Sequence, residues 1–214
     1  MRLRNIPGAK DAIAESIYVI QNPQENKGNW DKVFPQNQPV HLEVGMGKGR
    51  FLMDMAKLHP EINYIGIDLK DVVLAPAKRV IEAAFGEKPV QNVALTGHDI
   101  ERLPEIMDEH DRVERIYINF CNPWPKPRYW KRRLTYPTRL RDYRALLDPQ
   151  GEIWFKTDDG PLYRDTLRYL EEAGYQVYWC TEDLHADPCG DEITVMTEHE
   201  RMFSAQGIPI KALK

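Results

Sequence analysis

Short apolar runs alternate along this chain with longer stretches in which apolar and polar positions recur at helical spacing. The short runs predict strands at residues 40–44, 62–68, 91–96, 115–121, 151–156, 175–180 and 193–197. The amphipathic stretches predict helices from residue 51 to a stop at Pro60, at about 71–85, from 99 to about 108, and at 138–147 and 162–173. Strands that alternate with helices form βαβ units. We therefore expect an α/β fold with a mostly parallel, seven-stranded sheet and helices on both faces.

The first 39 residues lack this regularity. Arg2, Arg4 and Lys10 make the start basic, and turn-forming residues recur between positions 22 and 29. The pattern permits a short helix at about 11–20. We interpret residues 1–39 as a basic N-terminal arm and residues 40–214 as a single domain.

The predicted strand at 115–121 ends abruptly at Asn122-Pro123, because proline cannot donate to a strand ladder. Open α/β sheets bind ligands outside the carboxyl ends of their strands. One polar residue ends or follows each of five predicted strands: Glu43, Asp68, Asp99, Asn122 and Asp158. A single one of them fits a helix cap or a solvated turn. Five along one edge of a sheet predict a ligand site.

A glycine-rich turn follows the first predicted strand, in the pattern Glu43-x-Gly45-x-Gly47-x-Gly49. A dinucleotide fingerprint would need glycine at position 50, where Arg50 stands, and the phosphate-binding GxxxxGK[ST] pattern is also absent. The remaining pattern is typical of proteins that bind S-adenosylmethionine, which carries no phosphate. Asp68 is placed to accept both ribose hydroxyls, and Asp99 to hold an adenine amine.

Composition is that of a globular protein, with 214 residues, 42% of them hydrophobic and 29% charged. No apolar run is long enough to span a membrane and no signal peptide begins the chain, so we expect no membrane association. Three cysteines without metal or redox spacing suggest a reducing cytoplasm. The six histidines are scattered, so we expect no metal site.

The net charge of −4 argues against a nucleic-acid partner, but the charge is unevenly distributed. Between Lys126 and Arg144 the chain has eight lysines or arginines and one acid, Asp142. Aromatic residues are interleaved with the first of these, which suits bases as well as phosphates. The alternative interpretation is a solvated basic loop.

Several motifs are specific when taken together: EVGMGKGRF, NYIGID, NFCNPWPKPRYWKRRLTY, FKTDD, and a terminal Thr197-Glu198-His199-Glu200 with Phe203-Ser204 after it. With these the chain resembles, over almost its whole length, the bacterial tRNA (guanine-N7)-methyltransferases of the Rossmann-like, S-adenosylmethionine-dependent class. The resemblance implies an enzyme that methylates N7 of the variable-loop guanine of tRNA, acting as a monomer or homodimer.

The resemblance also implies roles for individual residues. Cofactor contacts fall to Glu43, Gly45, Gly47, Asp68, Asp99 and Asn122. Substrate contacts fall to Lys126, Asp158, Thr197, Glu198, His199 and Glu200. RNA contacts fall to Arg128, Tyr129, Trp130, Lys131, Arg132 and Arg133.

One departure from the family concerns the catalytic position. Most members have an aspartate in a DPW motif, whereas this chain has Asn122, and an amide cannot act as a general base. N7 of guanine is an unprotonated lone pair, so catalysis can rest on positioning.

Three alternatives stay open. NPW is similar to the Asn-Pro-Pro-aromatic turn of enzymes that methylate amino groups, so the target could be another nucleobase. The protein could also bind tRNA with catalysis weakened by Asn122. A nicotinamide dehydrogenase fits worst, because of Arg50 and the basic segment.

Overall fold

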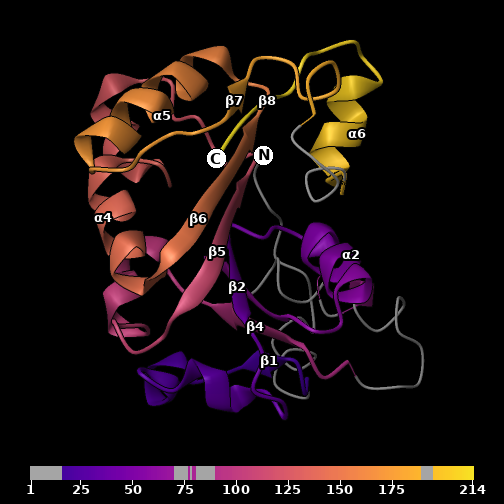
Figure 1. Cartoon of the computed structure of the whole chain (residues 1–214), viewed down its shortest axis with the longest axis vertical. Coiled ribbons are helices and arrows are strands. Elements are labelled where there is room, and N and C mark those ends of the chain that lie inside the picture. Colours follow the sequence, from indigo (N-terminus) through magenta and orange to yellow (C-terminus); the bar gives the residue numbers. More distant parts are fainter. Residues whose placement is uncertain (1–15, 70–76, 78, 81–89, 189–194) are drawn as a thin grey trace.

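The computed structural model describes residues 16–69, 77, 79–80, 90–188 and 195–214 (Figure 1). In this part of the chain eight strands form one sheet: β1 (Val19–Ile20), β2 (Val40–Val44), β3 (Asn63–Asp68), β4 (Val93–Gly97), β5 (Val113–Asn119), β6 (Leu147–Thr157), β7 (Cys180–Thr181) and β8 (Lys211–Leu213). Their order across the sheet is β1-β4-β3-β2-β5-β6-β8-β7. Neighbours from β1 to β6 are parallel, and β8 runs antiparallel to both β6 and β7.

Helices cover both faces of the sheet. Among the described residues, the α-helices with defined bounds are α2 (Arg50–Leu58), α4 (Pro137–Leu146), α5 (Gly160–Glu172) and α6 (Glu198–Ser204). Figure 1 shows α4 and α5 on one face and α2 and α6 on the other. Short 3₁₀ helices lie in the connections: η1 (Pro23–Asn26), η2 (Trp30–Val33), η3 (Ile100–Glu105) and η4 (Pro127–Arg132).

The core has two parts because side chains of a strand point alternately to opposite faces. Leu42 and Ile116 are fully buried among residues of α4 and α5. The neighbouring Tyr117 lies in the other part, with Phe51 and Leu52 of α2. The sheet is therefore buried on both sides, as the near-continuous apolar strands predict. The predicted α/β class and mostly parallel sheet are confirmed.

The sheet has one strand more than predicted, and that strand comes from the region interpreted as an arm. Val19 and Ile20 pair with β4, and Trp30 is 1% exposed. The indole nitrogen of Trp30 donates to the carbonyl oxygen of Ile106 at 2.7 Å. Residues 16–39 thus contribute to the core, which their irregular pattern did not indicate. The helix predicted at about 11–20 lies outside the described residues up to 15, and its last two residues form β1.

The end of the chain also differs from the prediction. The strand predicted at 175–180 is wrong except for its last residue, because β7 begins at Cys180. The strand predicted at 193–197 lies outside the described residues at 193–194, and its remaining residues are not a strand. Instead β8, only three residues long, occupies the place beside β6. The helix predicted at about 71–85 falls almost wholly outside the described residues; Ala77, Arg79 and Val80 are helical.

Candidate active site at the carboxyl edge of the sheet

The glycine-rich turn connects β2 to α2 at the carboxyl end of the sheet. Gly45 and Gly47 have φ values of +76° and +55°, which favour glycine. A Cβ atom on Gly45 would lie 3.0 Å from Leu134 Cδ1, whereas one on Gly47 would meet nothing within 4 Å. The backbone N–H of Gly47 donates to Asp68 Oδ2 at 3.0 Å. Asp68 therefore fixes the turn from the end of β3, and the space over Gly47 is open.

Glu43 lies beneath this turn in β2 and is 2% exposed. Its Oε1 atom accepts a hydrogen bond from Asn119 Nδ2 at 3.0 Å, and its buried Oε2 atom has no hydrogen-bond partner. Burial raises the pKa of Glu43 to about 8, although Asn119 and Lys156 oppose the shift. A buried acceptor without a partner is costly unless a ligand completes it. Asn119 was not among the predicted site residues.

The segment after β5 has a strained backbone. Phe120 and Trp124 have φ values of +50° and +42°, and they are the non-glycine residues with positive φ in the described part of the chain. Such conformations cost about 1–3 kcal/mol each and persist where surrounding contacts hold them. Asn122 Oδ1 accepts the backbone N–H of Trp124 at 3.0 Å, which closes an Asx turn. Asn122 itself is exposed. We call residues 120–124 the strained turn.

Helix α6 contacts both the strained turn and the glycine-rich turn. The ring of Phe120 stacks against His199 and Phe203, with centroid separations of 5.8 and 6.0 Å. Lys48 Nζ lies 3.0 Å from Glu198 Oε2. Glu198 and His199 therefore come from the far end of the chain to the edge where β2 and β5 end.

The other two residues of the terminal motif are buried. Thr197 and Glu200 form a capping box, in which Thr197 Oγ1 accepts the Glu200 N–H at 3.0 Å and Glu200 Oε2 accepts the Thr197 N–H at 3.3 Å. Glu200 Oε2 also lies 3.0 Å from Lys156 Nζ, in a buried ion pair. Burial lowers the pKa of Lys156, and Glu200 opposes that shift. The T-x-x-E spacing was a sequence signal for this cap.

The basic segment presents fewer free cations than its sequence indicated. Lys126, Arg128, Lys131 and Arg132, in or next to η4, are exposed. The remaining four of the eight basic residues bind other parts of the protein: Arg133, Arg139, Arg141 and Arg144. Arg141 and Arg144 are exposed but bonded to other parts of the protein, so the exposed cations of this segment without such bonds gather in and next to η4.

Aromatic rings and guanidinium groups form a cluster on η4. The rings of Trp124 and Tyr129 lie 5.7 Å apart between centroids. The guanidinium carbon of Arg132 is 5.4 Å from the Trp124 ring and 5.3 Å from the Tyr129 ring, and that of Arg128 is 4.7 Å from Tyr129. The exposed part of the basic segment therefore begins directly at the strained turn, through Trp124.

Arg133 was predicted to contact RNA, but its side chain is buried inside the protein. Its side chain is 2% exposed, and its guanidinium lies 5.0 Å from the half-buried Trp130 ring. It donates to Pro123 and to residues of α5. A phosphate cannot reach it in this structure, and we leave Arg133 out of the RNA-contact surface.

Asp99 and Asp158 are half-buried at the ends of β4 and β6. Asp99 caps η3, because its Oδ1 atom accepts the Glu101 N–H at 2.9 Å. The backbone oxygen of Asp158 accepts from Lys211 Nζ at 3.3 Å. Both carboxylates lie at the predicted edge.

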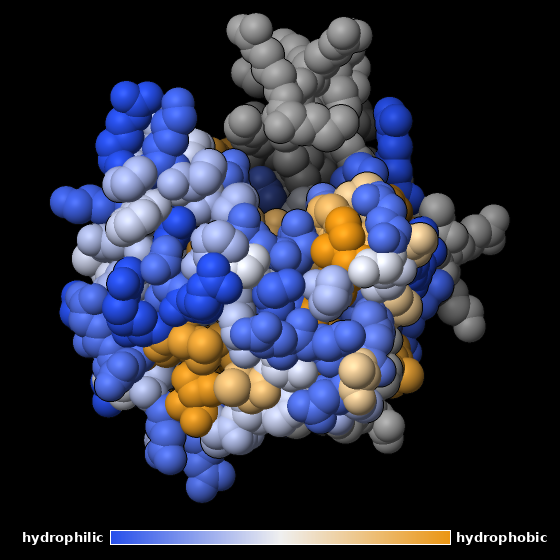
Figure 2. Space-filling view, turned by 90° about the horizontal axis from the view of Figure 1, so that it is seen from above, coloured by the Kyte–Doolittle hydropathy of each residue, from blue (hydrophilic) through white to orange (hydrophobic). Residues whose placement is uncertain are grey.

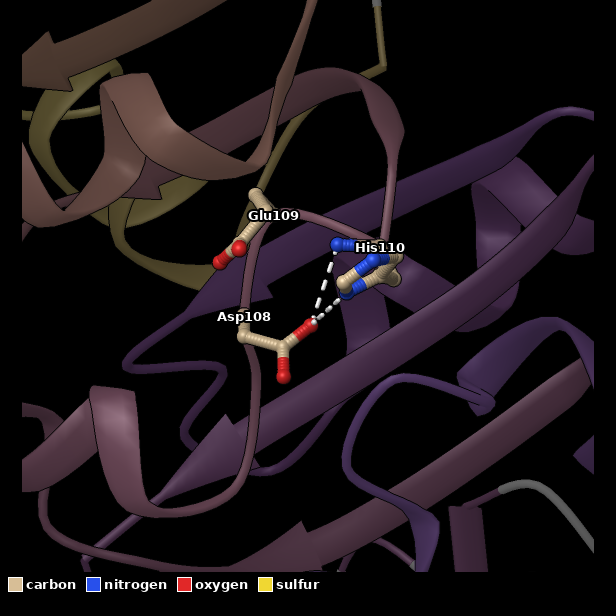
Figure 3. Close-up of side chains that lie close together, drawn as sticks. All are labelled: Asp108, Glu109 and His110. Carbon is tan, nitrogen blue, oxygen red and sulfur yellow. Dashed lines mark hydrogen bonds and ion pairs between the residues drawn. The ribbon is translucent and has the colours of Figure 1, made fainter.

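A separate group of possible metal ligands, Asp108, Glu109 and His110, lies before β5, away from this edge (Figure 3). Asp108 Oδ1 accepts both the backbone N–H and the Nδ1 hydrogen of His110 at 3.0 Å. Glu109 and His110 are exposed. This cluster is explained by the local hydrogen bonds, and we assign no metal to it.

The sheet order, the glycine-rich turn with Asp68 beside it and the buried carboxylate of Glu43 together define a Rossmann-like, S-adenosylmethionine-dependent methyltransferase. A solved structure of the 16S rRNA methyltransferase KamB is similar in fold, with a TM-score of 0.60 and 17% identity over 82% of this chain and 86% of that one. Residues 37–213 match the family model described as "Putative methyltransferase".

Curated relatives are much closer in sequence. The tRNA (guanine-N(7)-)-methyltransferase of Clostridium perfringens (strain SM101 / Type A) is 49% identical over 216 residues, which cover 100% of this chain and 98% of that protein. The protein of the same name from Clostridium botulinum (strain Eklund 17B / Type B) is 46% identical over 215 residues, covering 100% and 97%. The chain therefore belongs to the tRNA (guanine-N(7)-)-methyltransferase family, as its motifs predicted, and its cofactor is S-adenosylmethionine.

Proposed function

We propose that this protein transfers the methyl group of S-adenosylmethionine to N7 of a guanine in tRNA, and that the variable-loop guanine is the target. The observation that carries the proposal is the strained turn, which lies between the buried carboxylate of Glu43 and the exposed cations of η4. Strain of this kind gathers at functional sites. The turn thus joins a place for a cationic cofactor to a place for a polyanion.

The residues at the glycine-rich turn fit the cofactor. When bound, S-adenosylmethionine supplies an electrophilic methyl group on a positively charged sulfur. The unpartnered Glu43 Oε2 atom offers a hydrogen-bonding position to a ligand, and a cationic ligand would favour the ionised carboxylate. The open space over Gly47 lets a ligand approach the backbone. Asp68, which already orients the turn, and Asp99 supply carboxylates on the next strands.

The role of Asn122 follows from the chemistry of guanine. N7 carries no proton, so no general base has to remove one, and an amide could not do so. Asn122 Oδ1 holds the Trp124 N–H, and the amide NH₂ group remains as a donor on an exposed side chain. Asn122 therefore acts by holding the strained turn and by offering polar atoms beside the reacting base.

The tRNA would lie along η4. The exposed cations for phosphates are Arg128, Lys131 and Arg132, together with Lys126. Bases can stack on the rings of Trp124 and Tyr129.

The end of the molecule seen in Figure 2 is mostly hydrophilic, with hydrophobic residues in separate groups, which suits a polar partner. None of the described helices has the length and apolar character needed to cross a bilayer.

The residues predicted to contact the substrate differ in how exposed their side chains are. Glu198 and His199 on α6, and Asp158 at the end of β6, remain candidates for direct contact. Thr197 and Glu200 instead hold α6 in place through the capping box and the ion pair with Lys156. We also expect a monomer or homodimer in a reducing cytoplasm, where Cys121 and Cys180 stay free thiols.

A methyltransferase that acts on an exocyclic amine of another nucleobase is the first alternative. An asparagine that orients such an amine uses its carbonyl oxygen as the acceptor. Asn122 Oδ1 accepts the Trp124 N–H and has a second lone pair, so product analysis has to separate the two targets. The alternative of a tRNA-binding protein with weakened catalysis predicts binding without turnover.

The deciding experiment is nucleoside analysis of an unmodified tRNA transcript after incubation with the protein and S-adenosylmethionine. We expect 7-methylguanosine, and its loss when the variable-loop guanine is replaced by adenine. A different methylated nucleoside would show another target. Binding of both ligands without any product would favour the weakened-catalysis alternative.

A further inference from the structure

Arg133 is a buried arginine whose guanidinium joins the strained turn to helix α5. Its Nε atom donates to the carbonyl oxygen of Pro123 at 2.7 Å. Its Nη1 atom donates to Asp165 Oδ2 at 2.7 Å and to the Tyr169 hydroxyl at 3.3 Å. Asp165 is held in turn by Arg168, whose Nη2 lies 2.9 Å from Asp165 Oδ1.

The bond to Pro123 reaches the middle of the strained turn. Pro123 stands between Asn122 and Trp124, so its carbonyl group belongs to the backbone that the Asx turn shapes. The strained turn is thus held from outside by Asn122, which is exposed, and from beneath by Arg133, which is buried. Burial in a low-dielectric setting strengthens the lower contact.

We propose that Arg133 is a positioning residue for methyl transfer: its guanidinium holds the Pro123 carbonyl and keeps the strained turn in the conformation that places Asn122 and Trp124. This inference rests on the proposed function for its catalytic consequence. Its structural part, the anchoring of the turn to α5, stands on the contacts alone. Arg133 is buried beneath the strained turn, so it acts through that turn.

The planar guanidinium is what this position requires. Its donors point in fixed directions, so one side chain can serve the Pro123 oxygen, Asp165 and Tyr169 together. A lysine keeps the charge and can pair with Asp165. It cannot supply a fixed Nε donor to the Pro123 carbonyl oxygen. The lysine variant therefore shows whether the positive charge alone is enough or whether the bond to Pro123 is needed.

The test compares Arg133→Lys with two controls. Tyr169→Phe removes the longest of the three contacts and leaves the Pro123 bond intact. Arg132→Ala removes the neighbouring exposed cation. For each variant we would measure single-turnover methylation at saturating tRNA and S-adenosylmethionine, tRNA affinity as a function of salt, the melting temperature, and hydrogen exchange of the amides in residues 120–124.

If the proposal is right, Arg133→Lys lowers the single-turnover rate about 10- to 100-fold, the range expected when a reacting group is misplaced. Its amides in the strained turn exchange faster than in the parent, while exchange in β2 and β3 is unchanged. The affinity for tRNA and its salt dependence stay as in the parent. Tyr169→Phe keeps nearly the parental rate. Arg132→Ala weakens tRNA binding instead.

Three results would overturn the proposal. If Arg133→Lys melts earlier but reacts at the parental rate when folded, or if exchange rises uniformly over the protein, Arg133 is only a stabilising residue. If it loses tRNA affinity and salt dependence as Arg132→Ala does, Arg133 contacts RNA. Should the parent protein not methylate tRNA, the proposed function fails, and hydrogen exchange alone decides whether Arg133 anchors the turn.

Discussion

The role of Asn122 can be tested by two substitutions, one of which keeps an acceptor oxygen while the other removes it. Asn122→Asp keeps an oxygen that accepts the Trp124 N–H, and Asn122→Ala removes it. In the parent this bond is 3.0 Å long and closes the strained turn. The two variants therefore separate the acceptor from the chemical identity of the side chain.

The expected magnitude follows from the turn. A hydrogen bond of this kind contributes about 0.5–1.5 kcal/mol, and it supports a Trp124 conformation that costs about 1–3 kcal/mol. Losing the bond therefore lowers the population of the strained conformation, relative to relaxed ones, by up to about tenfold. The alanine leaves no polar side-chain atom at this position, and one well-placed polar group at a reacting centre is worth about 10²-fold or more. We expect Asn122→Ala to lose about 10²-fold in rate or more.

Asn122→Asp should stay active. Its carboxylate accepts the same N–H, in a charge-assisted bond, and places negative charge near the guanine cation that forms. The assay is single-turnover methylation of one unmodified tRNA by the parent and both variants, with enzyme in excess. A nearly inactive parent, with an aspartate variant faster by orders of magnitude, would refute the positioning account and favour weakened catalysis.

Three further outcomes are expected. The folded-state pKa of Glu43 is about 8, above its ordinary value of 4.5, so its contribution to stability is present below pH 4.5 and is lost as pH rises to about 8. The free energy of unfolding in urea should fall across this pH range in the parent and not in Glu43→Gln. Equal pH profiles for the two proteins would contradict a raised pKa for Glu43. Replacing Lys131 and Arg132 with alanine should lower the log-log salt slope of tRNA binding by about 1–2 units, at ~0.7–0.9 per phosphate contact, without changing cofactor affinity. An unchanged slope would mean that these side chains do not bind phosphates. The exposed ion pair between Lys48 and Glu198 can be tested by reversing the charge of one residue. Each single charge reversal should weaken cofactor affinity up to about fivefold at low salt, as measured by calorimetry. Exchanging both charges should restore the affinity. Unchanged cofactor affinity in the single variants would mean that this contact of α6 does not influence the cofactor site.

The local pattern of the sequence determined the central strands, the glycine-rich turn and the edge at which the site lies. Strands β2 to β6 are apolar runs between turn residues, and such runs are visible in a short window of sequence. The polar residues at their ends share one edge because parallel strands all point the same way. For this reason the order of residues along the chain was enough to predict that Glu43, Asp68 and Asn122 lie along this edge.

Burial and distant partners were decided by the tertiary structure. Arg133 and Arg132 are alike in sequence, yet only Arg133 meets Asp165, 32 positions away, and is taken out of solvent. Glu200 pairs with Lys156 across 44 positions, and a two-residue strand joins the sheet beyond β4. Charge and periodicity are properties of neighbours along the chain. Which cation is solvated, and which carboxylate is left with an unpaired oxygen as in Glu43, depends on what the fold packs against it.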